Sequence, residues 1–136
     1  MINMVNQESF EDIRPRAVVV MKANGKTFYP HLEDNQTANE FFNILNKGPV
    51  KVNFDGREGP VRAGMLSFVL PHEDNQTEAS LGEIILRNGN RIAICFDILS
   101  AVFTKIARIE NPLDKGLLDI IQDDIIEAEF SLEWSE

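Results

Sequence analysis

Cysteine, tryptophan and tyrosine are almost absent from this sequence, and so are long apolar runs. Cys95 is the single cysteine, so no internal disulfide can form. No apolar run approaches the ~20 residues that a membrane-spanning helix needs. The first residues, MINMVNQESFEDIRPR, lack the basic and apolar regions of a signal peptide. We therefore expect neither a disulfide scaffold nor a membrane protein, and we predict a cytoplasmic location.

Positive charge is also scarce. The chain has 13 Lys and Arg against 22 Asp and Glu, which gives a net charge of −9. Non-specific binding to nucleic acids and to anionic membranes depends on Lys and Arg, so we expect neither partner. The acidic residues crowd the C-terminal segment from residue 119 onwards. A solvated strand face is the first interpretation of this segment, and a surface for a basic partner is the alternative.

The motifs of several enzyme classes are missing. The glycines match neither nucleotide-binding fingerprint, and no nucleophile elbow is present. His31 and His72 are each followed by acidic residues, but they lie on separate segments, which is a thin basis for a metal site. Cys95 lies in an apolar run, which favours a buried and inert thiol. We therefore expect no cofactor and no metal.

The most informative stretch that is present covers residues 82–112, GEIILRNGNRIAICFDILSAVFTKIARIENP. It predicts two apolar strands, 83–87 and 91–96, joined by Asn88-Gly89. Asn-Gly accepts the positive φ angles of a tight hairpin turn. The second strand has no polar side chain after Arg91, so both of its faces should be covered.

Strand patterns recur along the rest of the chain. Residues 16–22 and 27–32 predict a first hairpin, with Pro30 at an edge or a bulge because proline cannot donate to a ladder. Single strands are predicted at 50–54, 102–109 and 126–134, and loops at 55–60 and 71–80. We expect the last strand to pair with the first, which places Arg16 or Lys22 opposite its glutamates.

Two helices are predicted between these strands. Thr37 and Glu40 have the spacing of a capping box, and Ala38, Phe41 and Leu45 follow on one helix face. A second helix is predicted to begin at Asn111-Pro112, since Asn can cap a helix and Pro is favoured at its first position.

The N-terminal residues 1–14 have weak periodicity and predict a loosely ordered tail, with a short helical piece at 9–13. The remaining residues, 15–136, form one predicted domain. Short antiparallel strands with two isolated helices suggest a closed β-barrel with helical plugs, because closure removes exposed sheet edges.

Three segments resemble the small prokaryotic cyclophilin-like barrel family. Residues 34–38, DNQTA, followed by Phe41 and Phe42, resemble its DN-x-TA-x-x-F start, and residues 82–84, GEI, resemble its GDI strand entry. Residues 104–112, TKIARIENP, are similar to its T-x-IGRIDNP segment, with Ala107 in place of the usual glycine. The resemblance implies a mainly β fold: a closed eight-stranded antiparallel barrel capped by two α-helices.

The resemblance implies less about activity. True cyclophilins isomerise X-Pro bonds with an apolar pocket and an arginine, and the motifs that carry this chemistry are missing from the sequence. Our first hypothesis is a non-catalytic binding module for a small molecule or short peptide. Its ligand groove on the barrel wall would be lined by Phe54, Arg57, Arg62, Phe68 and Phe103.

Two alternatives stay open. One is a weak peptidyl-prolyl cis-trans isomerase that uses the same groove. The other is a protein-interaction module that acts through an acidic face of the C-terminal strand, formed by Glu127, Glu129 and Glu133.

Overall fold

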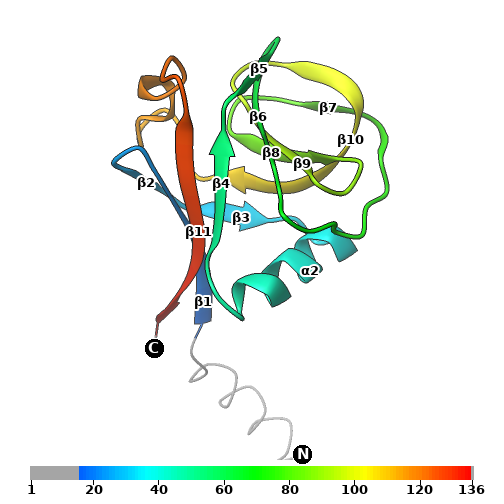
Figure 1. Ribbon diagram of the computed structural model, residues 1–136, viewed down its shortest axis with the longest axis vertical. Helices are drawn as coiled ribbons and strands as arrows, with labels where there is room; N and C mark the ends of the chain where they lie inside the picture. The colour runs from blue at the N-terminus through cyan, green and yellow to red at the C-terminus, as the bar shows by residue number, and fades with distance from the viewer. Residues whose placement is uncertain (1–15, 136) are drawn as a thin grey trace, which may run out of the picture.

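Two antiparallel β-sheets and one α-helix share a common hydrophobic core in the computed structural model, which describes residues 16–135 (Figure 1). The predicted tail at 1–14, with its helical piece at 9–13, lies outside the described residues. No helix in the described part of the chain is long and apolar enough to span a bilayer.

The smaller sheet joins the two ends of the described chain. Its strands, in spatial order, are β2 (Lys26–Phe28), β1 (Arg16–Ala23), β11 (Ile126–Ser135) and β4 (Val50–Phe54). β1 and β11 pair along their whole length, which confirms the predicted pairing of first and last strands. Lys22 lies opposite Glu129, as expected, whereas Arg16 lies opposite Ser135 rather than a glutamate.

The larger sheet contains the central hairpin. Its strands, in spatial order, are β3 (Pro30–Leu32), β10 (Leu99–Ile109), β8 (Glu83–Arg87), β9 (Arg91–Cys95), β6 (Val61–Met65) and β5 (Gly56–Glu58), and β7 (Asn75–Ala79) pairs with β10 as well. Asn88 has a φ of 58° in the β8–β9 turn, as the Asn-Gly dipeptide predicts. Pro30 lies on an edge strand, also as predicted. The loops predicted at 55–60 and 71–80 were wrong in part, because they contain β5 and β7.

The prediction of a closed eight-stranded barrel was wrong. Within residues 16–135 neither sheet returns to its own first strand, and the chain instead crosses between the sheets after β2 and after β4. β6 lies close against β4 but is hydrogen-bonded to β9 on one edge, and β5 occupies its other edge at Val61–Ala63. β4 therefore cannot form a hydrogen-bonded ladder with β6 at these residues, because both edges of β6 are already paired.

α2 (Gln36–Leu45) is the α-helix that the described residues contain, and it lies across the lower end of the fold in Figure 1. The capping prediction was displaced by two residues: Asn35 is the N-cap, and its side chain accepts from the amide of Ala38 at 2.8 Å. Thr37 instead donates its hydroxyl to the carbonyl of Pro71. The apolar face of α2 is as predicted, since the Phe41 ring packs edge-on against that of Phe130 at 5.5 Å.

The second predicted helix is not formed. Residues 110–125 contain isolated turns and a single 3₁₀ turn, Leu117–Asp119. Asn111 and Gly116 have φ angles of 47° and 88°, which interrupt a right-handed helix at two points. The prediction of two capping helices was therefore wrong, because only α2 is formed within the described residues.

The core has two parts, one on each face of the larger sheet. The main cluster fills the space between the two sheets and α2 and includes Ile92 and Ile94 of β9. A smaller cluster on the other face includes Ala93, Cys95 and Phe103 and lies beneath β7. Both faces of β9 are thus covered, as the apolar run predicts.

Candidate functional site

Arg62, the arginine of the predicted ligand groove, is 2% exposed on β6. Its five N–H groups all donate to backbone carbonyl oxygens, at distances of 2.7 to 3.2 Å. The acceptors are the carbonyls of Phe54, Gly56, Ile121, Asp123 and Asp124. A guanidinium has five donors, so this side chain has none left for a ligand.

Arg57 lies opposite Arg62 in the β5–β6 pair and contacts the same segment. Its Nη1 and Nη2 donate to the carbonyls of Ile121, Gln122 and Asp123. Burial, and next the nearby Arg57 charge, lower the pKa of Arg62, while the carboxylates of Asp123, Asp55 and Asp124 act in the opposite direction. The two arginines therefore anchor residues 121–124 to the larger sheet.

The three phenylalanines of the predicted groove are dispersed. Phe54 is fully buried in the main core, and Phe103 belongs to the smaller cluster. Phe68 is half-buried and lines a shallow depression beside Pro49 and Lys51. Of the five predicted groove residues, the structure brings together Arg57, Arg62 and the carbonyl of Phe54, and it places Phe68 and Phe103 on different cavities.

Phe103 leads to a different site, which we name the His72 cavity. This cavity of about 330 Å³ lies where the start of α2, the loop before β7, β7 itself and the middle of β10 meet. It is lined by Asn35, Gln36, Thr37, His72, Glu73, Asn75, Thr77, Phe103, Thr104 and Lys105. Its volume is within the range of small-molecule sites, and its lining is mostly polar, with Phe103 as the one apolar member.

His72 is held in this cavity by a network centred on Asp74. Nδ1 of His72 lies 3.3 Å from Oδ1 of Asp74, which also accepts the hydroxyl of Thr104 at 2.6 Å. The other carboxylate oxygen accepts the amide of Asn88 at 3.0 Å. Burial by itself would raise the pKa of Asp74, but these hydrogen bonds and His72 outweigh it, so the pKa lies below its usual value.

The contact with Asp74 determines which nitrogen of the His72 imidazole can accept a hydrogen bond from a ligand. A carboxylate beside Nδ1 favours the tautomer with its proton on that nitrogen, which leaves Nε2 as an acceptor while the ring is neutral. Asn35 and Thr37 are already engaged within the protein, because Asn35 donates to the carbonyl of Lys105 and accepts the amide of Ala38, and Thr37 donates to the carbonyl of Pro71. Gln36 lines the cavity with an amide side chain that can both donate and accept. The cavity therefore suits a polar ligand that hydrogen-bonds in both senses.

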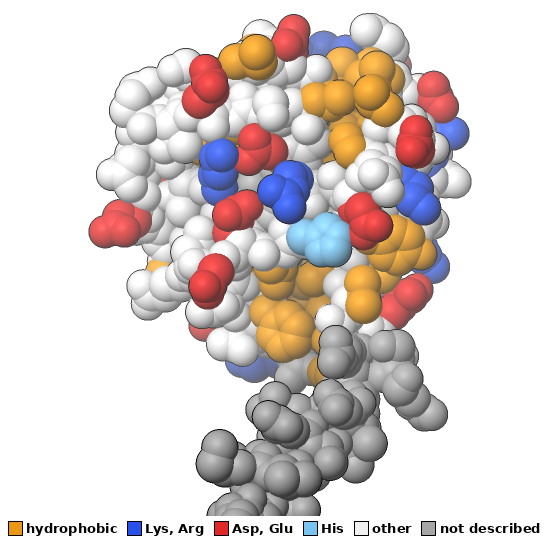
Figure 2. Space-filling view, turned by 180° about the vertical axis from the view of Figure 1, so that it is seen from behind, with side chains coloured by type: hydrophobic (Ala, Val, Ile, Leu, Met, Phe, Trp, Pro, Cys, Tyr) orange, Lys and Arg blue, Asp and Glu red, His pale blue; other side chains and the backbone are white. Residues whose placement is uncertain are grey.

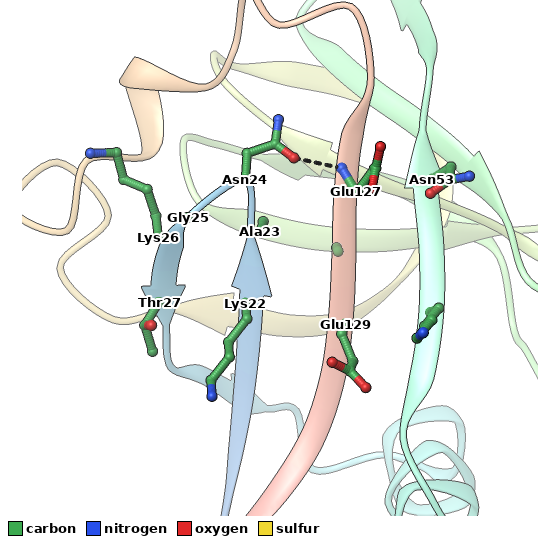
Figure 3. A pocket seen from close by; sticks show the side chains of 11 residues that line it. Lys22, Ala23, Asn24, Gly25, Lys26, Thr27, Asn53, Glu127 and Glu129 are labelled. Atoms are coloured by element: carbon green, nitrogen blue, oxygen red, sulfur yellow. Dashed lines mark hydrogen bonds between the residues drawn. The ribbon is translucent and has the colours of Figure 1, made fainter.

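A second hollow, which we name the sheet hollow, lies on the outer face of the smaller sheet (Figure 3). Its volume is about 490 Å³, and it is lined by the β1–β2 turn and the outward side chains of β1, β11 and β4. Lys22, Glu129 and Lys51 form one cross-strand row, and Asn53 lies opposite Glu127 in the next. Acidic and basic side chains also alternate over the opposite side of the molecule (Figure 2).

His31 lies apart from both hollows. Its Nε2 is 2.7 Å from Oε1 of Glu110, and both side chains are about half exposed. The two histidines thus belong to separate acidic contacts. Across residues 16–135, no three or more His, Cys, Asp or Glu side chains gather in an arrangement that would hold a metal ion.

Comparison with known proteins gives one result that agrees with the fold. A family model described as the cyclophilin-like family matches residues 21–131. The match spans most of the sequence, and the chain belongs to the cyclophilin-like family. No curated protein and no solved structure matched the chain. Family membership agrees with an antiparallel β fold and assigns neither a ligand nor a reaction.

Two residues of the His72 cavity could be identified from the sequence. His72 was singled out for its acidic neighbours, and Phe103 was predicted to contact a ligand. Nothing in the sequence placed Thr104 against Asp74, because the two residues are 30 positions apart and meet only when the loop folds onto β10. The polar segment 71–80 was predicted to be a loop, so the pairing of β7 with β10, which brings Asp74 to Thr104, was not expected.

Proposed function

We propose that this protein is a non-catalytic binding module that holds a small polar molecule or a short peptide in the His72 cavity. The observation that carries this proposal is the fixed imidazole: Asp74, itself held by Thr104 and the Asn88 amide, orients His72 at the wall of a cavity. A side chain held in one orientation loses little conformational entropy when a ligand binds, which favours affinity.

The composition of the lining supports the ligand class. The amide side chains of Gln36 and Asn75 and the first turn of α2 line the cavity together with Phe103, whose ring is almost wholly buried. The first amides of a helix have no acceptor within the helix; the Ala38 amide is bonded to the Asn35 side chain, which leaves those of Gln36 and Thr37 for other partners. A peptide group carries one donor and one acceptor, and it matches such a lining.

The isomerase alternative has less support. Isomerisation by an arginine requires a free N–H group directed at the prolyl nitrogen, and all five N–H groups of Arg62 are bonded to backbone carbonyls. The acidic-face alternative is also weakened. Glu129 lies between Lys22 and Lys51, so the potential of the C-terminal strand is partly cancelled by its neighbours.

The test is a titration of the ¹⁵N-labelled protein with N-acetyl dipeptide amides and with N-methylacetamide, monitored through backbone amide shifts. We expect saturable shifts confined to residues 35–37, 72–77 and 103–105. His72→Ala should weaken binding about tenfold, which corresponds to one lost hydrogen bond.

His31→Ala is the matched control, because His31 also contacts a carboxylate but lies outside the cavity. It should leave the binding constant unchanged. Equal weakening by the two histidine variants would contradict the proposal, and so would shifts that avoid the cavity residues at every probe concentration.

A further inference from the structure

The sheet hollow contains four charged side chains that lie close together on neighbouring strands. Lys22, Glu129 and Lys51 alternate in sign across three neighbouring strands, and Glu127 lies two residues before Glu129 on the same face. Within the described part of the chain, none of these four side chains takes part in an ion pair. Their side chains therefore keep hydrogen-bonding capacity for a ligand.

The framework beneath these charges is fixed. Asn24 donates to the carboxylate of Asp123 at 2.8 Å and to the carbonyl of Ile125 at 2.9 Å, and it accepts the amide of Glu127 at 2.9 Å. The turn between β1 and β2 is thus braced against β11, as Figure 3 shows for the contact with Glu127. Lys26, at the far side of the turn, is occupied by Asp119 at 3.2 Å.

We propose that the sheet hollow is a separate binding site for small zwitterions, in which the glutamates hold an ammonium group and Lys22 or Lys51 holds a carboxylate. A simple anion is attracted by the lysines but repelled by the glutamate between them. A simple cation is attracted by the glutamates but repelled by the lysines. A ligand that carries both charges gains from both sets of groups.

Strand geometry sets the length of the ligand. Neighbouring strands lie about 4.8 Å apart, and alternate residues on one strand lie about 6.7 Å apart. Side chains that start from these positions can therefore hold an ammonium and a carboxylate about 5 Å or slightly more apart. This separation matches an ω-amino acid such as 4-aminobutyrate better than it matches glycine.

The experiment is a titration of the ¹⁵N-labelled full chain at low ionic strength with glycine, 4-aminobutyrate and 6-aminohexanoate. Acetate and methylammonium, which each carry one of the two charges, are the control probes. We expect 4-aminobutyrate to shift the amides of residues 22–27, 51–53 and 127–129 saturably, with a dissociation constant of about 1 mM. Acetate and methylammonium should bind at least about tenfold more weakly.

Single substitutions inside and outside the sheet hollow distinguish binding at this site from a general effect of surface charge. Glu129→Gln and Lys51→Gln should each weaken 4-aminobutyrate binding about fivefold to tenfold, since each removes one charge contact. Glu133→Gln changes the same strand and the same face outside the hollow and should have no effect. The proposal is overturned if acetate or methylammonium binds as well as 4-aminobutyrate, if no zwitterion shifts these amides, or if Glu133→Gln weakens binding as much as Glu129→Gln.

Discussion

Arg62 Nη2 donates a hydrogen bond of 2.9 Å to the carbonyl oxygen of Phe54, which links the inside of β6 to the end of β4. The remaining N–H groups of this arginine reach the β5 strand and the segment 121–124. One buried side chain thus joins both sheets to a segment without regular structure. The carbonyls it satisfies would otherwise lack partners in a place where water has little access.

Substitution of Arg62 should therefore act on stability. Arg62→Lys keeps the charge but replaces five fixed donors with three on a flexible stem, and it leaves several buried carbonyls unpaired. We expect a loss of about 3 kcal/mol or more in the free energy of unfolding, measured by urea denaturation. Arg57→Lys, at an exposed position with the same acceptor segment, should cost less than about 1 kcal/mol. Equal losses in the two variants would contradict this role.

Gly64 allows β6 to approach β4 closely. A Cβ at this position would lie 2.5 Å from the carbonyl oxygen of Asn53 and 2.8 Å from a methyl group of Val52. Gly64→Ala should therefore push the two sheets apart and cost about 3 kcal/mol in thermal or urea unfolding. Gly56→Ala is a milder comparison, since its nearest contact would be 3.2 Å, and it should cost clearly less. A fully stable Gly64→Ala protein would show that the sheets are free to separate.

Asp74 should make stability depend on pH in the acid range. Its pKa is lowered in the folded protein, so its contribution is present above the pKa of the unfolded chain and is lost as the pH falls through the folded value. We expect unfolding free energy to fall as the pH drops below about 4, the pKa of an aspartate in the unfolded chain, and Asp74→Asn to flatten this fall. The exposed neighbour variant Glu73→Gln should keep the wild-type profile. Identical profiles for wild type and Asp74→Asn would refute the prediction.

Cys95 should report on unfolding. Burial raises the pKa of its thiol to about 12, and the side chain is inaccessible in β9. The thiolate is the reactive form, so a disulfide reagent such as dithionitrobenzoate should not label the folded protein at about pH 8. Labelling should instead follow the urea unfolding curve measured by circular dichroism. Rapid labelling of a protein that keeps its native spectrum would contradict this expectation.

Local signals predicted much of the secondary structure. Asn24-Gly25 and Asn88-Gly89 both form the tight turns that their tolerance of positive φ predicts, with φ angles of 48° and 58° at the asparagines. The alternation in β11 predicts its buried face from Ile126 to Phe130, but it fails at Trp134, which is 57% exposed. The pairing of β11 with β1 follows from the need to cover a strand edge. These signals depend on a few neighbouring residues, so they can be identified without knowledge of the rest of the fold.

The candidate site was predicted far less well. Arg62 was expected at a ligand, but its donors bond to backbone carbonyls, three of which are 59 to 62 positions away along the chain. Phe54 and Phe103 were expected to share a groove, but the larger sheet separates them into the two parts of the core. The position of His72 in the cavity depends on Asp74 and Thr104, whose contact requires β7 to pair with β10.

The sequence by itself determined the turns, the alternating faces of the strands, one helix and the inert thiol, because each follows from short-range sterics and periodic burial. Only the tertiary structure decided that the sheets stay separate, that residues 110–125 do not form a second helix, and that the polar side chains gather in the His72 cavity and the sheet hollow. Those outcomes depend on which distant groups compete for the same strand edge or carbonyl oxygen. These groups lie far apart in the sequence and come together only in the folded protein, so local sequence patterns cannot predict which of them will pair.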